Sequence, residues 1–196
     1  MTNIATGFDS IQDTLKNEMD RQFNADMPKA LALVASENLR LVNLKVFPSM
    51  SEETVAFTVT LKRGSKVIAY ARNDGHGGCT WIDAAPDQRD ALTTLERAWN
   101  AAIGIDQMRH ACRYDLEAWI NEAAYAKLNE AERKREEKRI ARFVAQCFNA
   151  NYAVCRIGEM WKSFGSRTHS RAELIAHVQA KHPEATDFKF PAHWVA

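Results

Sequence analysis

The residues from Asn73 to Trp81 read NDGHGGCTW and combine three of the eight glycines of the chain with a histidine and a cysteine. The backbone N–H groups of a glycine-rich loop can hold an anion, and a His/Cys pair can bind zinc or form a thiolate nucleophile. However, this loop lacks the Gly-Lys-Ser/Thr ending of a P-loop, and the residues after it read as a strand rather than a helix. These two observations exclude the common phosphate-loop and dinucleotide motifs.

Two interpretations of this loop remain open. Asp74-Gly75 is a strong turn dipeptide between two strand patterns, so the loop can simply be the turn of a hairpin. A plain hairpin needs only one glycine, and the additional ones indicate a sharp bend or the close approach of a partner. The second interpretation predicts a partner-binding loop composed of Asn73, Asp74, Gly75, His76, Gly77 and Gly78.

The same loop also contains residues that could belong to a zinc site or to a cysteine-dependent active site. His76-x-x-Cys79 and His110-x-Cys112 are short His/Cys pairs of the kind that a tetrahedral zinc site uses, although one pair has an unusual spacing. Without zinc, Cys79 would be a nucleophile, His110 its base and the loop N–H groups the oxyanion donors. The chain lacks the Gly-x-Ser-x-Gly and His-Glu-x-x-His motifs. This absence favours binding over catalysis, and zinc is the one cofactor that the residues suggest.

A second candidate surface lies in the charge run EAERKREEKRIAR, residues 130–142. Residues 131–196 contain 12 Lys/Arg against 7 Asp/Glu, whereas the rest of the chain contains 14 against 18. The interleaved glutamates are typical of a solvated helix of mixed charge, but a basic face that contacts phosphates is the alternative. The i, i+3, i+4, i+7 spacing would place four cations on that face, namely Arg135, Lys138, Arg139 and Arg142.

The elements that must position these residues follow from the hydrophobic periodicity. We expect a helix over residues 10–24 and a short second helix that Pro28 opens. Polar and apolar residues then alternate, with Val42, Leu44 and Val46 on one face, and further strands are expected over 55–61, 66–72 and 79–83. The fold class is therefore α+β, with an antiparallel meander of three or four strands against which helices pack.

We expect mainly helices after Pro86. One helix should stop at Gly104, and another should begin near Asp115 and either continue through the charge run or break near Asn129. We expect a helical, basic C-terminal third, with residues 157–164 forming a helix and a turn before a last helix, which the capping box Ser170-x-x-Glu173 opens. The expected organisation is an α+β core over 1–105 and a helical region over 106–196, or one continuous domain.

The beginning of the chain, MTNIATGFDS, has neither a cationic start nor an apolar run, and no apolar stretch is long enough to cross a bilayer. Four scattered cysteines without a secretory signal indicate reduced thiols. We therefore expect a cytoplasmic protein with no membrane partner.

The element VIAYARNDGHGGCTW, a strand followed by Asn-Asp-Gly-x-Gly-Gly and a second strand, resembles small accessory proteins of phages and plasmids over about fifteen residues. Such proteins often act by binding a host machine, including defence nucleases. The resemblance therefore implies a non-enzymatic accessory protein whose partner is a host protein or a nucleoprotein. Together with the residues, it leaves three functions open: a binding protein, a zinc- or cysteine-dependent enzyme, and a nucleic-acid-binding protein that uses the basic helices.

Overall fold

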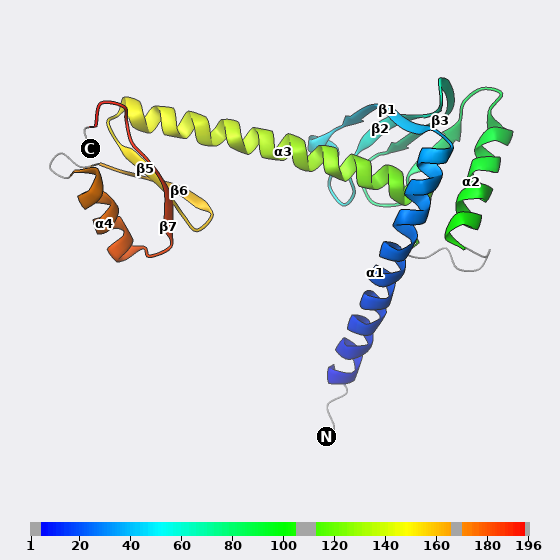
Figure 1. Cartoon of the computed structure of the whole chain (residues 1–196), viewed down its shortest axis with the longest axis horizontal. Helices are drawn as coiled ribbons and strands as arrows, with labels where there is room; N and C mark the ends of the chain where they lie inside the picture. Colours follow the sequence, from blue (N-terminus) through cyan, green and yellow to red (C-terminus); the bar gives the residue numbers. More distant parts are fainter. Residues whose placement is uncertain (1–4, 105–112, 166–169, 195–196) are drawn as a thin grey trace. The chain divides into compact units, whose positions relative to one another are not determined.

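The structure is a computed structural model that describes residues 5–104, 113–165 and 170–194. Helices and two antiparallel sheets alternate along the chain (Figure 1), which confirms the predicted α+β class. The chain divides into two compact units, Met1–Asn129 and Glu130–Ala196. Each unit has its own sheet and its own hydrophobic core.

The sheet of the first unit is the predicted meander, with strands in the order β1-β2-β3-β4. Each strand pairs antiparallel with the next, and Gly64 with φ +62° forms the two-residue turn between β2 and β3. A short 3-10 helix, η1 (Pro48–Met50), precedes β2. The four strands are β1 (Leu39–Val46), β2 (Phe57–Arg63), β3 (Lys66–Asn73) and β4 (Trp81–Ala84).

Helix α1 (Ala5–Ser36) is continuous through Pro28, so the prediction of two separate helices was wrong. Proline inside a helix removes one hydrogen bond and costs about 3 kcal/mol. Two features offset this cost: Pro28 is exposed, and the residues around it, including Met27 and Ala30, pack on the core of the sheet. Tertiary packing thus decided a boundary that the local sequence placed at the proline.

Helix α2 (Arg89–Ile103) and the part of helix α3 (Leu116–Asn149) that ends at Asn129 complete the first unit. Helix α2 stops at Gly104, which has the left-handed φ of +70° that was predicted for this cap. Helix α3 passes through Asn129 without a break, and its N-terminal part belongs to this core. The core buries one face of β2 and β3 against all three helices, with Trp99 completely buried at its centre.

The second unit confirms the prediction of a helical C-terminal third only in part, because it contains three strands in addition to the end of α3 and one further helix. Its strands form a sheet in the order β6-β5-β7, against which helix α4 (Arg171–Lys181) packs (Figure 1). Residues 157–164, which were expected to be helical, belong to a hairpin because Gly158 adopts φ +58° and turns the chain. The capping box of Ser170 and Glu173 is present as predicted. The strands are β5 (Ala153–Ile157), β6 (Met160–Phe164) and β7 (Ala185–Lys189).

None of the helices in the described part of the chain combines the length and the apolar character that crossing a bilayer requires.

Candidate nucleic-acid interface

The helices of the first unit pack on one face of the β1–β4 sheet, and no described residue of this unit covers the opposite face. We call the side chains of this second face the open face. Strand pairing places them in two rows that cross the whole sheet, because directly opposed residues point to the same side. The first row is Lys45, Thr58, Arg72 and Trp81, and the second is Val42, Thr60, Tyr70 and Asp83.

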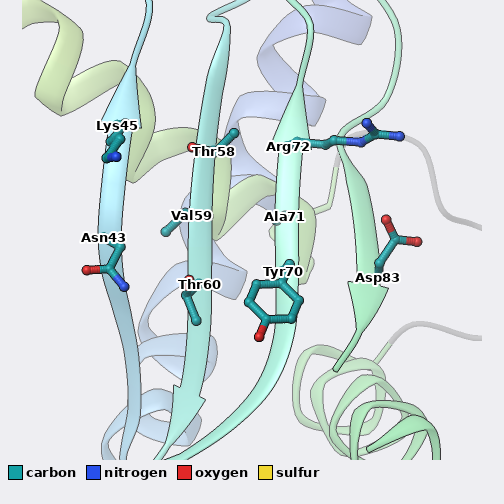
Figure 2. A pocket seen from close by; sticks show the side chains of 9 residues that line it. All are labelled: Asn43, Lys45, Thr58, Val59, Thr60, Tyr70, Ala71, Arg72 and Asp83. Carbon is teal, nitrogen blue, oxygen red and sulfur yellow. The ribbon is translucent and has the colours of Figure 1, made fainter. Parts of the chain in front are cut away.

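Figure 2 shows side chains from all four strands around a shallow hollow of about 350 Å³ on this face. Tyr70 lines this hollow and is 49% exposed. Trp81 lies outside the hollow, at the end of the first row, and is 62% exposed. The Arg72 guanidinium lies 5.9 Å from the centroid of the Trp81 ring, within the range of a cation–π contact. Aromatic rings that are exposed on a strand are available for stacking with a planar ligand.

The open face is also strongly basic. Arg40 lies directly opposite Lys62 at one end of the sheet, and Lys45 and Arg72 lie in the first row. Among the residues of the four strands, Asp83 is the one acid on this face. Like charges that oppose each other across two strands reduce stability, and the Arg40 guanidinium is held at this end of the sheet by a hydrogen bond that it donates to the Gly64 carbonyl.

A β-bulge in β1 brings Lys45 onto this face. The register between β1 and β2 shifts between Val42 and Lys45, and Asn43 adopts φ +55° within the bulge. As a result Val42 faces the open side, whereas Leu44 packs on the core. The expectation that Val42 shares the buried face of Leu44 was therefore wrong, because regular alternation does not continue through a bulge.

The predicted partner-binding loop is held to the body of the unit by the buried side chain of Asn73. Its Oδ1 accepts hydrogen bonds from Thr54 Oγ1 at 2.8 Å and from the Gly75 backbone N–H at 2.9 Å. Its Nδ2 donates to Thr80 Oγ1 at 3.3 Å, and Thr80 in turn donates to Asn121 Oδ1 on α3 at 2.6 Å. Asn73 therefore has a structural role that explains its place before the glycines.

Gly75 is needed for close packing rather than for contact with a ligand. Its carbonyl accepts hydrogen bonds from the backbone N–H groups of three successive residues, 52–54. A Cβ at this position would lie 2.0 Å from the Met50 carbonyl oxygen, and one at Gly77 would lie 2.4 Å from Glu53 Oε2. The backbone contact explains why position 75 requires glycine, whereas the Glu53 side chain can move away from position 77.

We expect Gly75→Ala to destabilise the first unit by about 2 kcal/mol more than Gly78→Ala does. Both positions have φ near +90°, so both substitutions introduce similar backbone strain, on the order of 1–2 kcal/mol. Only at Gly75 does the added methyl group also meet backbone atoms, since nothing lies within 4 Å of a Cβ at Gly78. Hydrogen–deuterium exchange of the β2 and β3 amides measures the difference, and equal effects of the two variants would contradict the structural role of Gly75.

The outer side of the loop stays available to a partner. Asp74, His76, Gly77 and Gly78 are exposed, and His76 Nδ1 lies 3.2 Å from Glu52 Oε2. The partner-binding role predicted for the six residues can therefore apply to these four, whereas Asn73 and Gly75 are buried within the fold.

Two of the four residues of the metal and cysteine alternatives, His110 and Cys112, lie outside the described residues. Cys79 is exposed and close in sequence to His76. Among the described residues, no three or more His, Cys, Asp or Glu side chains are grouped so that they could hold a metal ion. Cys155 is buried, and burial raises the pKa of its thiol even though the charge of Lys162 lowers it, so Cys155 is a poor nucleophile.

In the second unit, helix α3 separates the charges of the predicted basic run. Arg133 pairs with Glu137 at 2.6 Å and Lys134 pairs with Glu130 at 2.5 Å, both with i, i+4 spacing. These pairs satisfy the charges on one part of the helix surface, which matches the interpretation of a solvated helix of mixed charge.

The four predicted cations lie together on another part of the same helix. Arg139 pairs with Glu136 at 2.7 Å, whereas Arg135, Lys138 and Arg142 form no ion pair among the described residues. We call these four cations the basic stripe. It borders a shallow hollow of about 450 Å³, which is lined by Arg135, Lys138, Arg139, Arg142, Phe143 and Gln146.

None of the sequence motifs identified the open face, although the strands contain a signal for it. Tyr70 and Arg72 are two positions apart in a strand, as are Trp81 and Asp83, so each aromatic residue alternates in phase with a charged residue. Aromatic residues that share the polar phase of a strand point to solvent. That phase indicates an exposed position for the two rings rather than a place in the core.

Comparison with protein-family models, with curated proteins and with solved structures finds no match to this chain.

Proposed function

We propose that this protein is a non-enzymatic binding protein that holds single-stranded nucleic acid on the open face of its β1–β4 sheet. The observation that carries the proposal is the combination on one face of two exposed aromatic rings, Tyr70 and Trp81, with four cations. Aromatic rings stack on unpaired bases, and lysine and arginine contact the phosphates between them. A single-stranded nucleic acid uses both the stacking and the phosphate contacts, whereas an anionic small molecule needs only the contacts with lysine and arginine.

The shape of the site favours a single strand over a duplex. The hollow is shallow, and the Tyr70 ring lies on the sheet surface (Figure 2), where it can reach the face of a base only when that base is unstacked. Bases within a duplex offer only their edges, in grooves that fit a helix or a two-stranded ribbon. A single strand that lies across β1 to β4 would meet both rows of the open face.

The basic stripe supports a second phosphate contact in the other unit. Three of its cations lack an acidic partner in the described chain, unlike Arg133 and Lys134 on the same helix. The one aromatic residue that lines the hollow next to the basic stripe is Phe143, which is half-buried. The stripe would therefore contact phosphate, independently of base identity. The mobile-element context that the NDGxGG element implies is also a proposal, and the exposed side of the loop would then bind the host protein.

Salt dependence of binding tests the function directly. We expect the full chain to bind a fluorescently labelled single strand of about ten nucleotides with an affinity that decreases as the salt concentration increases. Replacing Lys45 and Arg72 together with glutamine should reduce the slope of log affinity against log salt by about 1.4, since each phosphate contact contributes about 0.7. Fluorescence anisotropy over a salt series gives both slopes.

The matched control is Arg133→Gln with Lys134→Gln, which removes the same two kinds of charge from exposed, ion-paired positions. This variant should keep the slope of the unchanged protein. The pair Arg135→Gln and Lys138→Gln should reduce the slope if the basic stripe contacts phosphate. Failure of the unchanged protein to bind any single strand at low salt would refute the proposed function, and the aromatic rings would then be explained as a protein-binding surface.

A further inference from the structure

The open face contains an acidic side chain that a surface for phosphates alone would not retain. Asp83 lies in the row of Thr60 and Tyr70, and the neighbouring row contains two of the four cations of this face. Its exposed carboxylate forms no hydrogen bond or ion pair within the described residues. A free carboxylate repels phosphate, so Asp83 weakens binding of the backbone wherever it makes no compensating contact.

The position of Asp83 relative to Tyr70 indicates what this contact would be. The two residues are direct cross-strand partners on β3 and β4, and Figure 2 shows both side chains on the same side of the sheet. Directly opposed residues have Cβ atoms about 5 Å apart. A base that stacks on the Tyr70 ring therefore extends its edge over the carboxylate, which is in position to accept hydrogen bonds from that edge.

The chemistry of a carboxylate selects one base. An ionised aspartate has only acceptors, and its two oxygens match two neighbouring donors. The Watson–Crick edge of guanine has such a pair, N1–H and the N2 amino group. Adenine and cytosine have one amino donor beside a ring-nitrogen acceptor, and thymine has one N–H between two carbonyl oxygens. The other three bases therefore place an acceptor against the carboxylate.

We propose that Tyr70 and Asp83 together form a guanine-selective subsite on the open face, with the ring stacking on the base and the carboxylate reading its edge. This inference rests on the proposed function, because it requires a single strand to bind on this face. Arg72 and Lys45 lie in the other row, where they would hold the neighbouring phosphates. Asp83 is thus a specificity-determining residue, and Tyr70 supplies affinity for any base.

The test compares oligothymidylates of about ten nucleotides that carry a single guanine, inosine or adenine at the centre, each bound to the full chain. We expect the guanine probe to bind at least about fivefold more tightly than the unsubstituted strand, as a good bidentate contact predicts. Inosine keeps N1–H but lacks the amino group, so its affinity should lie between the two. Adenine should give no gain.

Asp83→Asn should abolish the discrimination, because its amide offers one acceptor and adds donors that oppose those of guanine. The matched control is Asp87→Asn, which makes the same charge change at an exposed site where φ is +58° and asparagine is as well tolerated as aspartate. That control should retain the preference for guanine. Circular dichroism of each variant confirms that it is folded.

The outcomes separate the inference from the proposed function. Binding of all probes with equal affinity, or a preference for guanine that survives Asp83→Asn, overturns the guanine subsite and leaves the proposed function intact. An unchanged protein that binds none of the probes overturns both. A preference that is lost in Asp83→Asn and weakened by inosine supports the subsite.

Discussion

Replacing Asp26 with alanine is expected to lower the free energy of unfolding of the first unit by about 3–5 kcal/mol. The Asp26 side chain is completely buried in α1, and both its oxygens accept from the Arg113 guanidinium, at 2.5 Å from Nε and 3.1 Å from Nη2. Arg113 also donates to the Ile103 carbonyl at the end of α2. Removing the carboxylate leaves a guanidinium that is only 12% exposed without its counter-charge.

The control for this prediction is Glu18→Ala on the same helix. Glu18 pairs with Arg21 at 2.7 Å, but both side chains are more than half exposed. Exposed pairs contribute at most about 1 kcal/mol, so this variant should be nearly as stable as the unchanged protein. Hydrogen–deuterium exchange of the β2 and β3 amides reports the stability of this unit alone, and similar effects of the two variants would disprove the importance of the buried pair.

The same pair gives the stability of the first unit a dependence on acid. Burial by itself raises the pKa of Asp26, but hydrogen bonds from Arg113 and Gln22 and the charges of Arg113 and Lys29 outweigh it, so this pKa lies below its usual value. The pair therefore contributes its full stability above the unfolded pKa of about 3.9 and loses it as the pH falls through the lower, folded value. Asp26→Ala should flatten this acid-dependent part of the stability.

Combined replacement of Tyr70 and Trp81 by alanine is expected to reduce the affinity for single strands more than any charge substitution on the open face. Stacking on an aromatic side chain contributes about 1–3 kcal/mol per base, so each single variant should bind roughly five to a hundred times more weakly. The double variant should bind too weakly to measure by fluorescence anisotropy. Both side chains project from the sheet into solvent, so their loss should leave the fold intact.

Two further variants show whether the aromatic ring of Tyr70 is the part of the side chain that contributes to the affinity. Tyr70→Phe keeps the aromatic face and should keep most of the affinity. Tyr125→Ala removes an aromatic residue of similar exposure, 47%, from α3 of the same unit and should bind normally. If Tyr125→Ala weakened binding as much as Tyr70→Ala, the open face would not be the site.

The signals that are local in sequence were the ones that could be interpreted correctly. Ser170 and Glu173 are three residues apart, and Gly104 directly follows its helix, so the caps of α4 and α2 could be located without knowing the fold. The alternating pattern between residues 40 and 83 likewise predicted an antiparallel meander of three or four strands, and the sheet has four. In each case the few residues that determine the conformation are neighbours along the chain.

The sequence also misled where two local patterns compete. Residues 157–164 contain apolar and polar residues in an order that a helix or a strand can use, and pairing with Ala153–Ile157 and the turn at Gly158 decided for the strand. Pro28 marked a helix start locally, but the packing of the residues around it kept α1 continuous. Short apolar runs do not contain enough information to choose between such alternatives.

The sequence by itself determined the α+β class, the antiparallel meander and the helix caps at Gly104 and Ser170. Only the tertiary structure decided which distant residues come together: Asp26 meets Arg113 across 87 positions, Gly75 packs against Met50, and Tyr70 lies beside Asp83 on the open face. Periodicity and capping arise from contacts between neighbours a few residues apart. Burial, exposure and the pairing of charges depend instead on which distant segments pack together, and that information is distributed over the whole chain.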